Sequence, residues 1–231
     1  GYCGITIPID EEVKIPIKFT TKFIKWVFAI TRGGFTSASL FPIFALASML
    51  AAFGDNLFNP LSFILCLAGV VFLHLSSNLF NDYFDVKHGN DGINYEYFNA
   101  GLNSTMLEGA QLSGGSRAIE LGLITLNGTK RLANIMLFLT VFCTLMLLIN
   151  SYIVTQSFEN LIMALLIGFI GWFLGYFYTA KPIRLSARRG LGELAIFLTF
   201  GPLLTLGAYY AISSSTLSLI HISEPTRRYL I

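Results

Sequence analysis

Long apolar stretches, separated by shorter polar segments, run through most of the chain. A membrane-spanning helix needs about 20 mostly apolar residues. Five stretches have that character, and they cover residues 35–53, 60–80, 132–154, 161–178 and 194–213. The pattern predicts an all-α fold, a polytopic membrane helical bundle with about five transmembrane helices.

Basic residues fall in alternate connections between these stretches. The connections 54–59 and 156–160 contain no Lys or Arg. The segments before the first stretch, between the second and third, and between the fourth and fifth are basic: Lys14, Lys18, Lys22, Lys25 and Arg32; Lys87, Arg117, Lys130 and Arg131; Lys181, Arg184, Arg188 and Arg189. Because positive residues mark the cytoplasmic side, we expect the N-terminus and both large polar segments to be cytoplasmic.

Composition supports a membrane protein and argues against a nucleic-acid partner. The chain is 54% hydrophobic and only 12% charged, whereas a soluble domain carries about a quarter charged residues. A net charge of +2 is too small to indicate nucleic-acid binding. The three cysteines have neither a disulfide nor a zinc-site spacing.

The segment "NLFNDYFDVKHGND", residues 78–91, concentrates polar side chains at the end of the second apolar stretch. On a helix, residues four apart share a face, so Asn81 lies with Asp85 and Asn78 lies with Asp82. Asp91 follows a glycine and can fold back toward them. Carboxylate and amide oxygens are ligands that suit Mg²⁺. We predict a magnesium site with the following ligands: Asn81, Asp82, Asp85 and Asp91. The alternative is that these are solvated residues beyond the helix end.

Two further segments suit a diphosphate. "SGGSR" ends in Arg117, and backbone N–H groups beside a guanidinium bind phosphate well; an ordinary turn is the alternative. In residues 176–194, four basic residues follow the fourth stretch. Membrane topology alone explains that charge, but it does not explain Tyr178 and Glu193 at the same mouth.

Together these segments resemble the UbiA superfamily of intramembrane aromatic prenyltransferases. "NDYFDVKHGND" resembles the first Asp-rich motif of that family. Its step from Asp85 to Asp91 resembles the menaquinone branch, the 1,4-dihydroxy-2-naphthoate polyprenyltransferases. So do "GGSRAIELGLIT" and "YTAKPIRLSARRGLGELAIFLTFGPLLTLGAYY". The resemblance covers about residues 32–210.

The resemblance implies a Mg²⁺-dependent transferase that joins a polyprenyl diphosphate to an aromatic acceptor. It implies a helical bundle around a cavity in the lipid bilayer, here of the bacterial inner membrane, with its active site on the cytoplasmic side. The catalytic residues would be Asp85, Asn81 and Tyr178. The diphosphate-binding residues would be Arg117, Lys87, Arg184 and Arg188.

One departure from the family pattern stands out. The family has a second Asp-rich motif, and no Asp follows Gly201. We therefore expect residues 1–220 to be the N-terminal part of a single prenyltransferase domain, truncated and inactive as written. The ending "HISEPTRRYLI", residues 221–231, is expected to be a non-native tail. Acceptors other than the naphthoate stay open (4-hydroxybenzoate, homogentisate, haem or a glycerol-phosphate lipid), as does a transporter with an Asp/Asn ion site.

Overall fold

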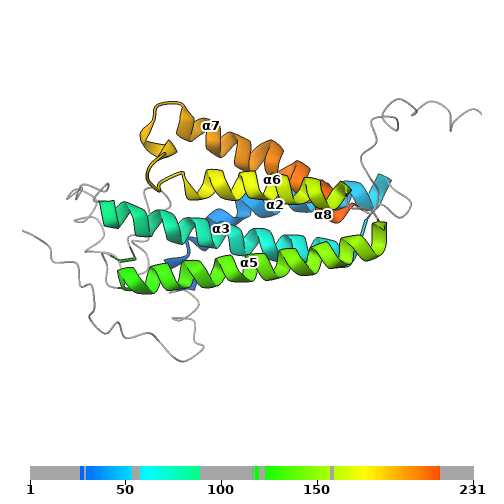
Figure 1. Cartoon of the computed structure of the whole chain (residues 1–231), viewed down its shortest axis with the longest axis horizontal. Coiled ribbons are helices and arrows are strands. Elements are labelled where there is room, and N and C mark those ends of the chain that lie inside the picture. The colour runs from blue at the N-terminus through cyan, green and yellow to red at the C-terminus, as the bar shows by residue number, and fades with distance from the viewer. Residues whose placement is uncertain are drawn as a thin grey trace, which may run out of the picture.

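The computed structural model describes residues 27–28, 30–53, 58–88, 116, 118–119, 123–156 and 159–213. Within them the chain is a bundle of long helices (Figure 1). The described part of the chain contains no strand, and its one β-type pairing is a bridge between Phe58 and Ser213. The helical elements are η1 (Gly33–Thr36), α2 (Ser37–Phe53), α3 (Pro60–His88), α5 (Leu126–Thr155), α6 (Glu159–Tyr176), η2 (Leu185–Ala187), α7 (Leu191–Leu198), η3 (Thr199–Leu203) and α8 (Leu204–Ile212).

Four helical segments are long and apolar enough to cross a membrane, and they confirm an all-α polytopic fold. They are Gly33–Ala52, Pro60–Lys87, Leu126–Thr155 and Leu191–Ile212. The remaining predicted stretch, the fourth, corresponds to α6, a shorter apolar helix over Ile162–Tyr176. Helices α3 and α5 extend beyond the predicted apolar limits, because backbone hydrogen bonding continues through polar residues. Thr125 caps α5 by accepting a hydrogen bond from the Gly128 N–H at 3.0 Å.

The most extensive helix contact joins α3 to α5. Ala133 of α5 is fully buried against Leu79 and Phe80 of α3. The Ser76 hydroxyl donates to the Ala133 carbonyl oxygen at 2.9 Å. Small residues let membrane helices approach closely, and short interhelical hydrogen bonds then add to the packing. This pair therefore gives the polar end of α3 a rigid support.

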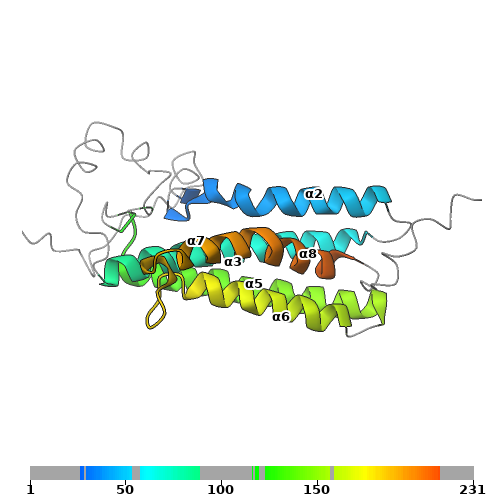
Figure 2. The ribbon, with the colours of Figure 1, turned by 90° about the horizontal axis from the view of Figure 1, so that it is seen from above.

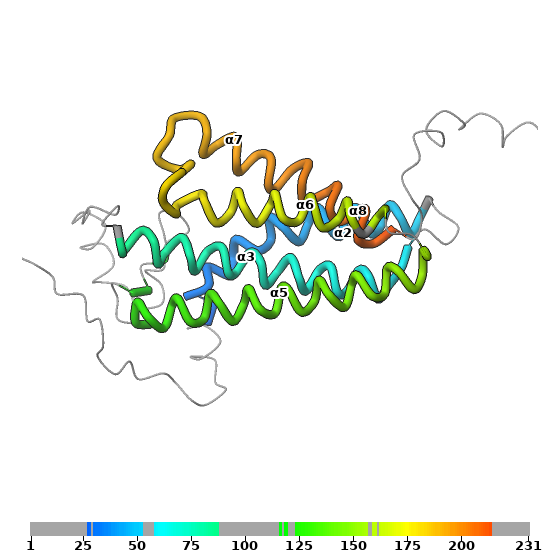
Figure 3. The backbone as a smooth tube through the Cα atoms, in the orientation of Figure 1, coloured from blue at the N-terminus to red at the C-terminus, as the bar shows by residue number. Residues whose placement is uncertain are grey.

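A broken helix, α7–η3–α8, packs its second half against α6 and α2. The break falls at Gly201, whose backbone is non-helical (φ −97°, ψ −105°), and Pro202 follows it. Proline lacks the N–H that would continue the helical bonding. Figure 3 shows α7 diverging from α6 on one side of this break, and Figure 2 shows α2 on the opposite side of the bundle from α5 and α6.

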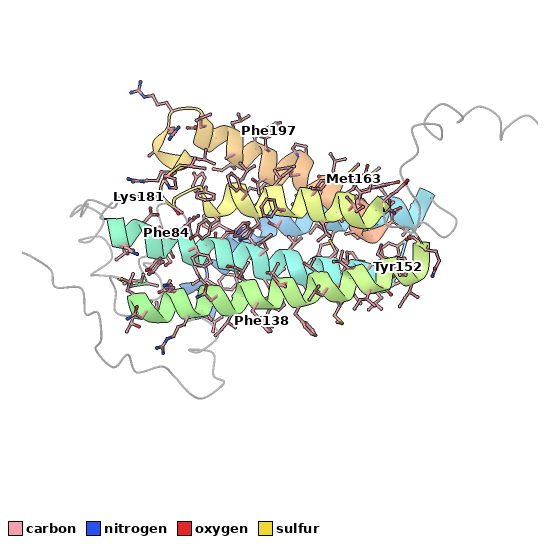
Figure 4. All side chains as sticks on the ribbon, in the orientation of Figure 1. Phe84, Phe138, Tyr152, Met163, Lys181 and Phe197 are labelled. Atoms are coloured by element: carbon pink, nitrogen blue, oxygen red, sulfur yellow. The ribbon has the colours of Figure 1, made fainter. Side chains whose placement is uncertain are left out.

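Large apolar side chains cover the outside of the bundle. Phe138 of α5 and Phe197 of α7 are 69% and 66% exposed, and with Met163 they point outward from three helices (Figure 4). Single exposed apolar residues are common in soluble proteins, but whole helix faces of Phe, Ile, Leu and Met are suited to lipid. The outer surface therefore agrees with a membrane-embedded bundle.

Five segments meet at one end of the bundle, on the left in Figure 1: the end of α3, the start of α5, the end of α6, the start of α7 and the residues before α2. The described basic residues of the alternate connections lie at this end: Arg32, Lys87, Lys130, Arg131, Lys181, Arg184, Arg188 and Arg189. The polar segment of residues 78–88 lies in the last turns of α3, so it is helical and not a solvated loop.

Candidate active site

Two polar rows run along the last turns of α3, each with a spacing of four residues. We call His74, Asn78 and Asp82 the α2-side row, and Ser77, Asn81 and Asp85 the α6-side row. Residues spaced by four share a helix face, so each row has its own neighbours. The two rows are adjacent on the helix but contact different parts of the molecule.

The α2-side row is hydrogen-bonded to α2 and to the residues before η1. The His74 Nδ1 atom and the Ser39 hydroxyl are hydrogen-bonded at 2.7 Å, and both side chains are buried. Asn78 donates from Nδ2 to the Thr31 carbonyl oxygen at 3.2 Å. Buried polar groups in a membrane need such partners, because no water replaces them there.

Asp82 completes this row and is only 7% exposed. Its Oδ1 accepts the Ser116 N–H at 3.3 Å and lies 3.8 Å from the Arg32 Nη1 atom. Its Oδ2 accepts a hydrogen bond from the Ser116 hydroxyl. The carboxylate therefore ties α3 to the segment before α5 and to the residue before η1.

The α6-side row faces α6 and the connection that follows it. A Cβ atom at Gly175 would lie 3.0 Å from the Ser77 hydroxyl oxygen, so glycine permits this close approach. The Thr179 hydroxyl donates to the Asn81 Oδ1 atom at 2.9 Å. This bond orients the Asn81 amide with its oxygen toward the connection after α6.

Tyr178 lies in the connection after α6, and its ring packs against the start of α7, where a Cβ atom at Gly192 would lie 3.7 Å from the Tyr178 Cε2 atom. Burial raises the pKa of the Tyr178 hydroxyl above its usual range, and the carboxylates of Glu193 and Asp85 raise it further, against a smaller lowering by Arg32. The next residue, Thr179, is hydrogen-bonded to Asn81 of α3. The connection after α6 therefore contacts both α3 and the start of α7.

The connection between α6 and α7 folds back on itself and holds Tyr178 in place. Leu185 N–H donates to the Phe177 carbonyl oxygen at 3.1 Å, and Ser186 N–H donates to that of Tyr178 at 2.9 Å. A Cβ atom at Gly192 would lie 3.3 Å from the Leu185 carbonyl oxygen, so α7 begins tightly against this turn.

Arg32 lies beside the α2-side row, next to Asp82. It has a left-handed backbone (φ 54°, ψ 43°), an uncommon conformation for a residue with a side chain. Its guanidinium lies 4.8 Å from the centre of the Phe35 ring, and its Nε is buried with no hydrogen-bond partner among the described residues. The same side chain contacts Asp82 and influences Tyr178.

The predicted diphosphate ligands are only partly brought together. Lys87 is exposed, and its Nζ lies 5.4 Å from the centre of the Tyr83 ring, which Lys130 of α5 also approaches at 6.0 Å. Lys87 therefore lies on the α5 side of α3, away from the α6-side row. Arg184 is half-buried and Arg188 exposed in the connection after α6, which also carries Lys181, labelled in Figure 4. Arg117 lies outside the described residues.

The described residues form part of the predicted magnesium site. No group of three His, Cys, Asp or Glu suited to a metal occurs among them, since Asp82 is turned toward Arg32 and Ser116 and Asp91 lies outside the described residues. Asn81 and Asp85 carry side-chain oxygens on one helix face. Magnesium is commonly held by one or two carboxylates plus waters and substrate phosphates, so this pair fits the ion without Asp82.

Comparison with known proteins gives two similarities. The chain is 28% identical over 155 residues, 66% of its length, to "UbiA prenyltransferase domain-containing protein 1" of Dictyostelium discoideum. It is 54% identical over 43 residues, 19% of its length, to "2-carboxy-1,4-naphthoquinone phytyltransferase" of Synechocystis sp.. No protein-family model and no solved structure matches.

These similarities cover only part of each relative. The matched region spans 39% of the Dictyostelium protein and 14% of the Synechocystis protein. Both relatives are named as transferases of prenyl-type groups. The similarities therefore support a relationship of this chain to UbiA-type prenyltransferases.

Proposed function

We propose that this chain carries part of the active site of an intramembrane prenyltransferase, which moves a polyprenyl group from a polyprenyl diphosphate to an aromatic acceptor. The observation that carries the proposal is the hydrogen bond from Thr179 to Asn81, which brings the residue after Tyr178 against the α6-side row at the polar end of an apolar bundle. Oxygen ligands beside an aromatic ring suit a diphosphate that leaves and an allylic cation that forms.

Asn81 and Asp85 hold Mg²⁺ in this proposal. The bound ion would neutralise charge that develops on the departing diphosphate. Thr179 orients the Asn81 amide so that its position is set before substrate arrives. Arg184, Arg188 and Arg117 are proposed to bind diphosphate oxygens, because guanidinium groups form paired hydrogen bonds with phosphate.

The reaction breaks the allylic C–O bond, and its electron pair leaves with the diphosphate. The Tyr178 ring face stabilises the allylic cation. A carbon of the electron-rich acceptor ring then forms the new C–C bond, and the ring regains aromaticity by losing a proton from that carbon or, where the carbon bears a carboxylate, by losing CO₂. Phe80, Phe84 and Tyr176 pack with ring centres 5.5 to 6.1 Å apart beside this mouth and exclude water.

The acceptor is proposed to be 1,4-dihydroxy-2-naphthoate, as in menaquinone biosynthesis. The support is the short, strong similarity to a relative named for a naphthoquinone substrate and the spacing from Asp85 to Asp91. The bilayer holds the prenyl tail. We place the polar mouth on the cytoplasmic side of the bacterial inner membrane from the alternation of basic segments.

The test is product formation in membranes from cells that express the complete coding sequence. A labelled polyprenyl diphosphate is added with 1,4-dihydroxy-2-naphthoate or with another aromatic acceptor, with and without EDTA. The proposal expects a prenylated naphthoquinone product that EDTA abolishes. Turnover that is independent of Mg²⁺, or uptake of substrate without turnover, would contradict it, and the second result would favour the transporter hypothesis.

A further inference from the structure

We propose that Asp82 is a positioning residue that fastens Arg32 and Ser116 to α3, and that it is not a magnesium ligand. This inference rests on the proposed function, because it assigns a role within the same site. It gives different roles to the carboxylates of Asp82 and Asp85, which lie only three residues apart in one motif. Asp85 acts on the metal, and Asp82 acts on the protein around it.

Both oxygens of the Asp82 carboxylate are already engaged. Oδ1 accepts the Ser116 N–H at 3.3 Å and faces the Arg32 guanidinium at 3.8 Å, while Oδ2 accepts the Ser116 hydroxyl. The side chain is 7% exposed. A metal at Asp82 would compete with these donors, and the half-buried Arg32 guanidinium beside Oδ1 would repel the positive charge of the ion.

The segment that Asp82 holds is a packed part of the structure. Ala118 and Ile119 are each 2% exposed and pack with Ile30 and Ile124. The Ala118 N–H donates to the Ser116 hydroxyl oxygen at 3.2 Å. Ser116 is thus the polar end of a small apolar cluster, and Asp82 is the group that satisfies it.

The second group that Asp82 holds is Arg32, whose Nη1 atom lies 3.8 Å from the Asp82 Oδ1 atom. The guanidinium also lies 4.8 Å from the centre of the Phe35 ring. Removing the carboxylate frees this guanidinium from its counter-charge. The expected consequence is a poorer fit for the donor diphosphate, with the magnesium ligands still in place.

The experiment compares Asp82→Ala and Asp82→Asn with Asp85→Asn in the complete protein. In Asp82→Ala, the KM for prenyl diphosphate should rise about 10- to 100-fold, the usual cost of losing a group that supports a binding residue. The Mg²⁺ concentration for half-maximal rate should not change. Asp82→Asn keeps an oxygen that accepts from Ser116 and should recover part of the loss. Asp85→Asn should raise the Mg²⁺ requirement instead.

A coupling test uses Ser116→Ala, which removes the hydroxyl and keeps the N–H. Because the Ser116 hydroxyl donates to the Asp82 carboxylate, the rise in KM of the double variant should be smaller than the two single effects combined. Additive losses would contradict the proposed contact. An increase in the Mg²⁺ requirement of either Asp82 variant, equal to that of Asp85→Asn, would overturn the positioning role.

Hydrogen exchange gives a readout that does not need turnover. In detergent, Asp82→Asn should speed exchange at the amides of Ser116 and Ala118, whereas Asp85→Asn should leave them as in the wild type. If the wild type transfers no prenyl group but these amides respond as stated, the proposed function fails and the fastening role stands. Unchanged exchange in Asp82→Asn would overturn the fastening role itself.

Discussion

The two polar rows of α3 differ in what they contact, although one short motif supplies both. The α2-side row of His74, Asn78 and Asp82 is bonded to Ser39, Thr31 and Ser116. The α6-side row of Ser77, Asn81 and Asp85 faces the end of α6 and the aromatic mouth. A membrane helix can therefore use one face to hold the bundle together and the next face to present ligands.

The largest expected effect comes from Asp85→Ala, in the row that presents ligands. Loss of a carboxylate that holds the metal should lower kcat by at least about 100- to 1000-fold, the range for removing one electrostatic stabiliser of a transition state. The measurement is turnover of labelled prenyl diphosphate in membranes, with membrane insertion checked in the same samples. Retained turnover would refute the metal role of Asp85.

The next effect concerns the aromatic mouth beside that row. Tyr178→Ala removes the ring face over the forming cation, worth up to about 2 kcal/mol or about 30-fold in rate. Tyr178→Phe keeps the ring and should keep most of the rate. Tyr152→Ala, at the opposite end of the bundle in Figure 4, is the matched control.

Acid–base chemistry at Tyr178 would give a different result. Its pKa is raised, so the phenol stays protonated through neutral pH. The wild type and Tyr178→Phe should therefore have pH–rate profiles of the same shape below about pH 10. If Tyr178→Phe were as slow as Tyr178→Ala, the hydroxyl and not the ring would be the working group.

A smaller effect is expected at Thr179, which orients the Asn81 amide of the α6-side row. Thr179→Val keeps the shape and removes the donor to Asn81, so the Mg²⁺ requirement should rise about 10-fold, as for other groups that orient a metal ligand. Thr140→Val is the control, because the Thr140 hydroxyl bonds only to the Met136 carbonyl oxygen of its own helix among the described residues. An unchanged requirement in Thr179→Val would show that the Asn81 amide needs no orientation.

The smallest effect belongs to the row that holds the bundle together. Ser39→Ala removes the partner of His74, which should lower the free energy of unfolding by about 0.6 kcal/mol, an average value for a hydrogen bond between membrane helices. The Mg²⁺ requirement should stay constant. Ser48→Ala, whose hydroxyl bonds to Phe44 within α2, is the matched control for stability. A changed Mg²⁺ requirement in Ser39→Ala would break the separation of the two rows.

Much of the fold follows from hydrophobic runs and charge. Apolar length predicted the membrane helices, whereas the polar extensions of α3 and α5, the short apolar run of α6 and the break at Gly201 differ from it. Helical spacing also paired Asn81 with Asp85 and Asn78 with Asp82. These relations are local, so a sequence can reveal them.

The partners of each row could not be predicted, because they depend on tertiary packing. Nothing near Ser116 in the sequence marks it as the partner of Asp82, which lies 34 residues away. The left-handed backbone at residue 32 could not be predicted either, because this position holds an arginine and not the glycine or asparagine that usually adopts it. The family resemblance implied Lys87 as a diphosphate ligand, and the helix places its Nζ atom 5.4 Å from the centre of the Tyr83 ring. Residues two apart in one motif, such as Asp85 and Lys87, lie on different faces of the helix.

The most direct test of the two-row account is metal binding to the purified protein. Mn²⁺ replaces Mg²⁺ as a paramagnetic probe, and its binding is followed by electron paramagnetic resonance in the presence of inorganic diphosphate. The account predicts that Asp85→Asn weakens Mn²⁺ binding by about 10-fold or more, while Asp82→Asn binds Mn²⁺ as the wild type does. Equal weakening in the two variants would contradict the account, because it would make both carboxylates ligands of one ion.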